Sequence, residues 1–192
     1  MAGKVKKIDW MFLRWLNRRV HCRALDFIMP KITLLGDKGI FWMLIALILI
    51  IFKKYRYYGV LMLVGMLMGL VLGNGVMKHV VGRARPCWED ENLRLLIRNP
   101  RDYSFPSGHT LSSMISATIL MFANPYFGIA AAVIAILIAF SRLYLCVHFL
   151  SDVLVASFMG ILIGILTCFL LGTLVIALFD RFHLNIMERL QY

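Results

Sequence analysis

The stretch KGIFWMLIALILIIF, from Lys38 to Phe52, carries no charged residue after its first position. A membrane-spanning helix needs about 20 predominantly apolar residues, and this stretch is close to that length. It ends at the cluster KKYRYY, Lys53 to Tyr58, whose basic and tyrosine side chains are typical of a membrane–water interface. Asp37 precedes the stretch and is the expected N-cap. The stretch therefore predicts a first transmembrane helix.

The rest of the chain has the same character. Of its 192 residues 61% are hydrophobic, and the mean hydropathy is +0.80, which excludes an ordinary soluble domain. Further spans are expected at about residues 58–77, 106–122, 125–141 and 148–179, with Asn124 as N-cap and Pro125 as first helical residue of the fourth. We predict a single all-α domain over residues 1–192, a polytopic helical membrane bundle of about five to six transmembrane helices.

The N-terminal segment differs from these spans. Between Trp10 and Ile28, Leu13 and Leu16 fall on one helical face while Arg14 and Arg18 fall on another. This pattern predicts an amphipathic interfacial helix within residues 1–36, ahead of a catalytic helical bundle over residues 37–192. Insertion of residues 10–36 would instead add a sixth crossing. A cleavable signal peptide is not expected, because no uninterrupted apolar core precedes residue 30.

The charge pattern favours lipid as the partner. The formal net charge is +11, and basic residues beside apolar spans favour anionic lipid head groups over nucleic acid. The four cysteines have no C-x-x-C spacing, so neither a zinc site nor a disulfide framework is indicated. The sequence leaves the oligomeric state open.

Polar residues are expected to gather at one membrane face. Successive spans alternate in direction, so the end of span two, the start of span three, the end of span four and the start of span five meet on the same side. That side receives a set of ionisable and hydroxyl side chains: Lys78, Arg83, Arg85, Ser107, His109, Arg142, His148 and Asp152. Ionisable residues at such positions are functional candidates, although a lone one is more often an interface anchor.

The tetrapeptide PSGH, Pro106 to His109, begins the third span. A helix N-terminus presents unpaired N–H groups and partial positive charge, Gly108 admits a ligand close to the backbone, and Ser107 adds a hydroxyl. An ordinary helix cap would look the same. Lys78 and Arg85 are seven residues apart and would share a face on a continuing helix. Together with Arg142 they favour a phosphate dianion over a carboxylate.

His148 and Asp152 stand at i and i+4, where the carboxylate can orient the imidazole. A structural His–Asp pair is the usual meaning of this spacing taken alone. His109 brings a second imidazole to the same face. Two histidines in two roles beside an anion cradle indicate phosphoryl transfer through a covalent phosphohistidine.

Three motifs carry a family resemblance. KHVVGRARP (Lys78 to Pro86), PSGH and SRLYLCVHFLSD (Ser141 to Asp152) resemble the signature K-x6-R-P, P-S-G-H, S-R-x5-H-x3-D of the type 2 phosphatidic acid phosphatase family. The resemblance implies a metal-independent, cofactor-free phosphatase with its site at the membrane surface. It implies that His148 attacks phosphorus, that Asp152 orients it, and that His109 protonates the leaving oxygen and later activates water. Phosphate would be bound by the remaining signature residues, which are Lys78, Arg85, Ser107, Gly108 and Arg142.

The substrate is less defined than the chemistry. The resemblance permits phosphatidylglycerol phosphate, phosphatidate and undecaprenyl diphosphate. Gly108 and Lys78 favour a phosphatidylglycerol-phosphate or broad lipid phosphatase, because diphosphatases of the bacitracin-resistance type often carry P-S-D-H and lack the lysine. A dedicated undecaprenyl-diphosphate phosphatase is the alternative, and a non-enzymatic lipid-binding or transport protein is a more remote one. The family implies a site on the extracytoplasmic side of the cell membrane, whereas the positive-inside rule favours the cytoplasm.

Overall fold

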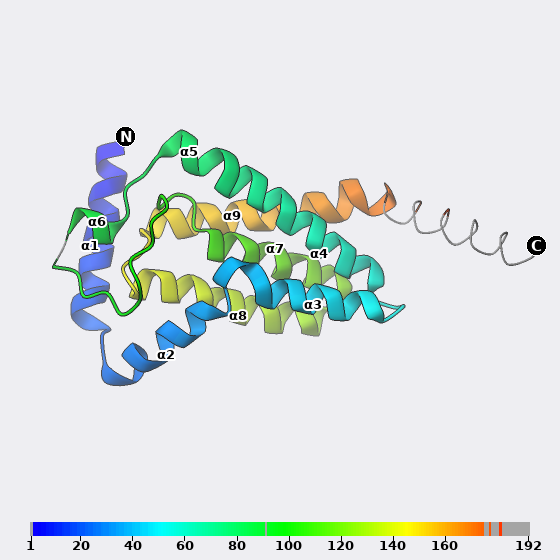
Figure 1. Ribbon diagram of the computed structural model, residues 1–192, viewed down its shortest axis with the longest axis horizontal. Coiled ribbons are helices and arrows are strands. Elements are labelled where there is room, and N and C mark those ends of the chain that lie inside the picture. Colours follow the sequence, from blue (N-terminus) through cyan, green and yellow to red (C-terminus); the bar gives the residue numbers. More distant parts are fainter. Residues whose placement is uncertain (1, 91, 175–176, 178–180, 182–192) are drawn as a thin grey trace, which may run out of the picture.

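The fold of this chain is all-helical over the residues that the structure describes. The structure is a computed structural model that describes residues 2–90, 92–174, 177 and 181. Its elements are α1 (Ala2–Arg19), α2 (Arg23–Leu34), a short 3₁₀ turn η1 (Asp37–Gly39), α3 (Ile40–Ile51), α4 (Arg56–Gly69), the π-helical η2 (Leu70–Met77), α5 (Lys78–Val81), α6 (Pro86–Glu89), α7 (Gly108–Ala123), α8 (Pro125–Tyr144), α9 (Leu150–Leu166) and the π-helical η3 (Thr167–Leu171). Figure 1 shows the long helices lying side by side, with α1 across one end of the bundle.

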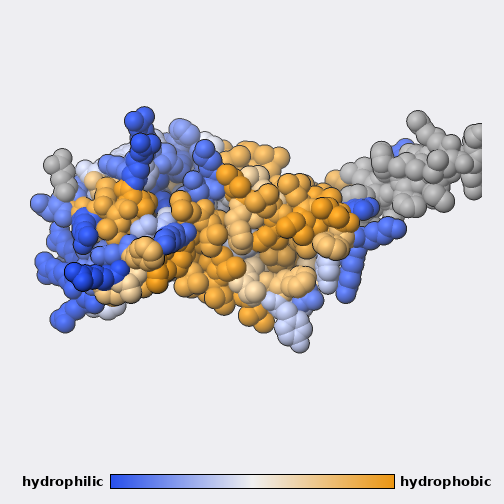
Figure 2. Space-filling view, turned by 60° about the horizontal axis from the view of Figure 1, so that its bottom comes forward, coloured by the Kyte–Doolittle hydropathy of each residue, from blue (hydrophilic) through white to orange (hydrophobic). Residues whose placement is uncertain are grey.

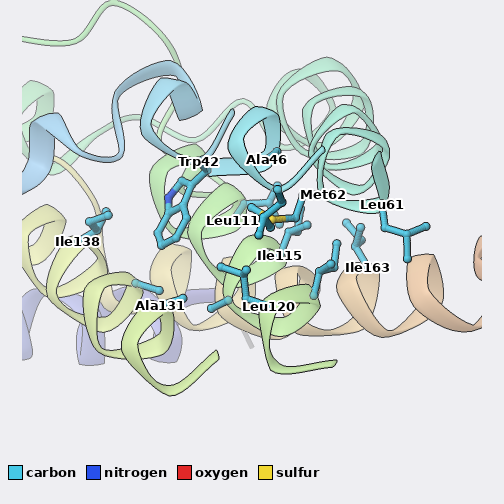
Figure 3. Packing of buried hydrophobic residues seen from close by; sticks show 14 of the residues in the cluster. Trp42, Ala46, Leu61, Met62, Leu111, Ile115, Leu120, Ala131, Ile138 and Ile163 are labelled. Carbon is cyan, nitrogen blue, oxygen red and sulfur yellow. The ribbon is translucent and has the colours of Figure 1, made fainter. Parts of the chain in front are cut away.

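Helix α7 lies at the centre of this bundle and packs on α4, α8 and α9. Ile115 and Ile119 of α7 are fully buried in a core that also contains Trp42 and Met62 (Figure 3). The indole Nε1 of Trp42 donates a hydrogen bond of 2.9 Å to Ser113 Oγ. A buried indole N–H needs such a partner, so this bond fixes α3 on α7.

Small residues let α9 approach α7 closely. A Cβ atom at Gly160 would lie 2.7 Å from Met114 Cβ, and one at Gly164 would lie 2.7 Å from Thr118 Cβ. Close approach through glycine is the usual packing device of membrane helices, where apolar burial gives little net attraction. The register is thereby set between the middle of α7 and the second half of α9, and it carries over to the first turns of both helices.

The surface has the pattern of an integral membrane protein. Within the part of the chain that the structure describes, three helices are long and apolar enough to cross a membrane, over Arg56–Glu89, Pro125–Tyr144 and Leu150–Leu174. The pair α2 and η1–α3, bent by 41°, would make a fourth, and α7 is apolar but shorter. On the face seen in Figure 2, apolar side chains cover the middle of the molecule, and hydrophilic side chains gather at the end that carries α1. The predicted class, an all-α polytopic membrane bundle, is confirmed.

The N-terminal segment departs from the prediction. The continuous amphipathic helix expected over Trp10 to Ile28 is wrong, because α1 ends at Arg19 and α2 begins only at Arg23. At the break, the His21 ring stacks on Tyr144 at 4.2 Å, and the Tyr144 hydroxyl donates a 2.6 Å hydrogen bond to Asp26 Oδ1. These contacts with α8 override the local helical periodicity. Placement of α1 in the membrane interface stays a prediction.

Two expected caps had different outcomes. Asn124 is the N-cap of α8, its side chain accepts a 2.9 Å hydrogen bond from Tyr126 N, and Pro125 follows as predicted. Asp37 does not cap α3. It begins the 3₁₀ turn, and Gly39, in the left-handed region at φ 70°, is the N-cap. Backbone geometry that only glycine adopts easily therefore starts α3.

Candidate active site

The signature residues meet at the end of the bundle that carries α1. A cavity of about 1200 Å³ opens there. It is lined by six of the eight predicted site residues, from four separate segments: Lys78, Arg85, Gly108, His109, Arg142 and His148. The directional argument from alternating spans thus places them correctly. Ser107 and Asp152 are fully buried next to this group rather than on the cavity wall.

His148 lies in the loop between α8 and α9 and is 1% exposed. Its Nδ1 is 3.8 Å from Asp152 Oδ2, which is an ion-pair distance and too long for the hydrogen bond that the i, i+4 spacing led us to expect. Ser104 stands beside both groups: its Oγ donates to Asp152 Oδ2 at 2.5 Å and lies 3.4 Å from His148 Nδ1. The carboxylate is therefore connected to the imidazole through Ser104.

Asp152 is held firmly in this position. It lies in the first turn of α9, and its Oδ2 accepts a 2.9 Å hydrogen bond from the backbone N–H of Phe149, the N-cap residue. Its Oδ1 accepts a 2.6 Å hydrogen bond from Arg83 Nη1. The same residue thus caps the helix and faces the histidine.

The surroundings of the His148 imidazole favour its neutral form. Burial, followed by the positive charges of Arg85, Arg142 and Lys78, lowers the pKa of His148 well below its usual range. Arg85 Nη1 lies 3.1 Å from His148 Nε2. A neutral imidazole keeps a lone pair for attack, and a cation beside that nitrogen marks where an anionic substrate would be drawn in.

Lys78 and Arg85 converge in a different way from the one predicted. The helix does not continue between them: α5 ends at Val81, Gly82 follows at φ 56°, and Arg85 has extended backbone. They meet instead at Asp102, whose carboxylate forms an ion pair with Lys78 Nζ and lies 2.9 Å from Arg85 Nη2. Burial raises the pKa of Asp102, but the hydrogen bond from Lys78 and the charges of both cations outweigh it and lower the pKa to about 2.

The PSGH motif forms the start of α7, as predicted. Ser107 is the N-cap and Gly108 the first helical residue. Ser107 Oγ lies 2.9 Å from Thr110 Oγ1. A Cβ atom at Gly108 would lie 3.1 Å from Asn74 Oδ1, so the glycine accommodates Asn74 and leaves the backbone open to the cavity. A helix N-terminus that faces a cavity lined with cations is suited to an anion.

Arg142 supplies a further indication of a bound anion. It is 4% exposed, and its Nη1 donates a 2.5 Å hydrogen bond to Thr33 Oγ1. Its buried Nε has no hydrogen-bond partner among the described residues. Buried donors are nearly always satisfied, and Arg142 is one of the residues that line the cavity, so its guanidinium is suited to an acceptor bound there. Over the same residues there is no cluster of three or more His, Cys, Asp or Glu that could hold a metal ion.

The fold and the site together define an integral membrane protein with a cationic cavity, suited to an anion, at one end of its helical bundle. Residues 54–176 match the family model described as PAP2 superfamily, and the chain belongs to this family. The predicted family is thus confirmed.

Two relatives are similar to this chain in sequence. The chain is 33% identical over 127 residues to the undecaprenyl-diphosphatase of Sulfolobus acidocaldarius, an alignment that covers 66% of this chain and 61% of that protein. It is 31% identical over 169 residues to phosphatidylglycerophosphatase B of Bacillus subtilis, covering 78% of this chain and 72% of that one. The match to the first relative therefore spans less than two thirds of its length.

Two solved structures are similar to this chain in fold. The transmembrane PAP2-type phosphatidylglycerolphosphate phosphatase of Bacillus subtilis matches with a TM-score of 0.70 at 28% identity, over 85% of this chain and 84% of that chain. LpxE of Aquifex aeolicus matches with a TM-score of 0.68 at 26% identity, over 83% and 94%. The similarity extends over most of the chain in both cases.

Sequence reasoning did not identify several residues that the structure places in or behind the site. Asp102 and Ser104 lie in the loop between the first two motifs, and nothing in their spacing distinguishes them from other loop residues. Arg83 was placed on the correct face but given no role. Asp9 lies in a helix whose other charged residues are exposed, so a sequence pattern offers no signal that it is buried.

Proposed function

We propose that this protein is a membrane-integral lipid phosphate phosphatase that removes a terminal phosphate through a phosphohistidine on His148. One observation carries the proposal: a single cavity joins the cationic site to an apolar wall formed by residues such as Leu63, Leu67 and Leu70. A cavity with one cationic and one apolar part suits an amphipathic substrate. Two of the matched proteins are named as a phosphatidylglycerol phosphate phosphatase and an undecaprenyl-diphosphatase, which supports this class.

In the first step, the neutral imidazole of His148 attacks phosphorus and the bond to the leaving oxygen breaks. Lys78, Arg85 and Arg142, with the N–H groups at the start of α7, bind the phosphoryl oxygens. Ser107, which the sequence suggests as a further phosphate ligand, is buried behind the cavity wall with its Oγ 2.9 Å from Thr110 Oγ1, so we assign it to holding the helix start. His109, on the first turn of α7, donates the proton that the leaving oxygen needs. Asp152 orients His148 and balances its positive charge when the P–N bond forms.

In the second step, His109 removes a proton from water as the water attacks the phosphohistidine. Inorganic phosphate leaves, and His148 returns to its neutral form. Every charge that stabilises the transferred group belongs to a fixed side chain or to the helix start. The proposed reaction scheme therefore uses no metal ion and no cofactor.

The site residues recognise the phosphate head group of the substrate, so they define its class without defining its apolar tail. Phosphatidylglycerol phosphate and phosphatidate are the first candidates, because Lys78 and Gly108 are both present and the Bacillus relative carries the corresponding name. Undecaprenyl diphosphate is the second candidate, and the Sulfolobus relative is the observation that favours it. Nucleic acid has no part in this proposal.

We place the protein in the cell membrane with the active site on the extracytoplasmic side. The basic side chains at this end include Lys78, Arg85 and Arg142, which line the cavity. Residues that bind substrate are poor indicators of topology, so the positive-inside rule has less weight here than the family resemblance.

The decisive assay measures phosphate release from each candidate lipid by the purified protein in detergent with excess EDTA. We expect release with wild-type protein, none with His148→Ala, and inhibition by vanadate, which mimics a five-coordinate phosphoryl group. Activity that vanishes in EDTA and returns with magnesium would contradict the mechanism. Binding of lipid phosphates without release would indicate a lipid-binding protein instead.

A further inference from the structure

A buried polar network joins the N-terminal helix α1 to the first turn of α9. Asp9, in the middle of α1, is 1% exposed. Its Oδ1 accepts a 2.9 Å hydrogen bond from Ser151 N, and its Oδ2 accepts hydrogen bonds of 2.6 Å from Ser151 Oγ and 2.6 Å from Arg83 Nη2. A buried carboxylate is expensive unless it is paired in this way, so its position is closely defined.

Arg83 connects Asp9 to the catalytic carboxylate. One end of its guanidinium, Nη2, binds Asp9, and the other, Nη1, donates to Asp152 Oδ1 at 2.6 Å and to Ser151 Oγ at 2.7 Å. The planar fork of arginine suits two carboxylates at once, whereas an ammonium group provides a single point charge. The guanidinium also lies 4.2 Å from the centre of the Phe149 ring, which limits its movement.

Apolar contacts attach α1 at the same place. The Trp10 ring packs edge to face on Phe149 with 5.3 Å between ring centres, and Leu13 is buried beside Phe149 and Cys146. Phe149 is the N-cap of α9 and follows His148 directly. Helix α1 therefore contacts the segment that carries both His148 and Asp152.

The hydrogen bonds of Asp152 show why this contact affects chemistry. Its Oδ1 is held by Arg83, and its Oδ2 by Ser104 and by Phe149 N, while His148 lies beyond hydrogen-bond distance at 3.8 Å. The orientation of the carboxylate is thus determined by its other partners. Arg83 is the cationic one, and Asp9 fixes where Arg83 lies.

We propose that Asp9 and Arg83 are positioning residues for Asp152, so that α1 is a working part of the active site. The proposal rests on the phosphatase function above and extends it to a helix outside residues 54–176, the segment that matches the family model. Neither residue is among those that line the cavity. Their effect should therefore fall on the rate of the chemical steps and not on phosphate binding.

The test is the Asp9→Asn variant, which keeps the shape of the side chain and removes its negative charge. We expect kcat to fall by roughly 10- to 100-fold, the usual effect of losing a partner behind a directly acting group, with KM and the inhibition constant of inorganic phosphate unchanged. Because Asp152 supports the nucleophile, the kcat of Asp9→Asn should fall by the same factor with lipid phosphate and with nitrophenyl phosphate as substrate. Lys6→Gln is the matched control: it breaks the exposed 2.8 Å ion pair between α1 and Glu89 and should leave kcat unchanged.

A double-mutant comparison separates positioning from general destabilisation. In an Asp152→Asn background, Asp9→Asn should cause no further loss of kcat, since the group it positions has lost its charge. Arg83→Lys is a second variant, expected to lose kcat in the same pattern with unchanged KM. Wild-type kcat in Asp9→Asn, or an equal loss in both backgrounds, would overturn this inference alone. A wild-type protein without phosphatase activity would overturn the proposed function and this inference together.

Discussion

The first turn of α7 and its middle lie in contrasting surroundings. In the first turn, Ser107, Gly108 and His109 stand beside the cationic cavity. Two turns on, Ile115 and Ile119 are fully buried against the apolar core of α3, α4 and α9. The core fixes where α7 lies, and this placement brings the helix start to the proposed catalytic groups. Changes in the two regions should therefore have separable effects, on chemistry in one and on stability in the other.

The largest effect is expected from His148→Ala. Removal of the attacking nitrogen should abolish turnover with every substrate, because no second nucleophile is assigned in the scheme. Thermal unfolding should stay near that of wild-type protein if the site and the core are separable. A variant that hydrolyses lipid phosphate at the wild-type rate would place the nucleophile elsewhere.

Substitution of His109 by Ala should discriminate between leaving groups. General acid assistance is worth roughly 10²–10⁴-fold, so hydrolysis of a lipid phosphate should fall by that factor. Nitrophenolate leaves without a proton, so phosphorylation of the enzyme by nitrophenyl phosphate should fall much less. Rapid-quench kinetics with both substrates measures this contrast. Equal losses would mean that His109 binds phosphate and donates no proton.

A core substitution tests the other side of the comparison. Ile115→Ala should destabilise the protein by about 2–5 kcal/mol, the usual cost of removing a large buried aliphatic side chain. Protein that remains folded should keep the wild-type kcat. Denaturation in detergent followed by assay of the folded fraction checks both values. A large drop in kcat with unchanged stability would show that the core and the site are coupled.

The smallest effect concerns Asp102, which occupies the two cations in this structure. Its pKa of about 2 means that the carboxylate is ionised throughout pH 5–9 and loses its charge only as the pH falls toward 2. Its side chain is 56% exposed, and exposed ion pairs are worth at most about 1 kcal/mol. Phosphate must compete with Asp102 for Lys78 and Arg85. Asp102→Asn removes this competing charge and should therefore lower the inhibition constant of inorganic phosphate by up to roughly 5-fold.

The pH dependence of that effect is part of the same prediction. Because Asp102 does not titrate between pH 5 and 9, the ratio of wild-type to variant inhibition constants should not follow its ionisation in this range. Phosphate inhibition assays across these pH values measure the ratio. A weaker binding of phosphate in Asp102→Asn would mean instead that Asp102 positions Lys78 and Arg85.

The sequence predicts those parts of the site that follow from motif and direction. Alternating spans bring His109, Arg142 and His148 to one end, and the PSGH motif begins a helix there. The sequence does not predict how the groups connect. Lys78 and Arg85 meet through Asp102 and not along one helix, and Ser104 lies beside both His148 and Asp152. Loop residues reach these positions through tertiary folding, which leaves no periodic trace in the sequence.

The N-terminal segment shows the same limit in the fold. Its apolar periodicity predicts a helix through Val20, but contacts of His21 and Asp26 with Tyr144 break it. In the sequence, Asp9 is not distinguished from the other charged residues of a basic amphipathic helix. Its burial against Ser151 and Arg83 depends on how α1 crosses the bundle. Local pattern therefore determines the helices, and long-range packing determines which polar residue of α1 reaches the site.

Direct detection of the phosphoenzyme tests the central claim most closely. The measurement is rapid-quench trapping of His109→Ala with radiolabelled nitrophenyl phosphate, followed by mapping of the labelled residue by mass spectrometry. This variant should form phosphohistidine and then stall, because the group that activates water is missing. The account predicts an acid-labile, base-stable phosphate on His148, absent in the His148→Ala, His109→Ala double variant. Label on another residue, or label that persists without His148, would contradict it.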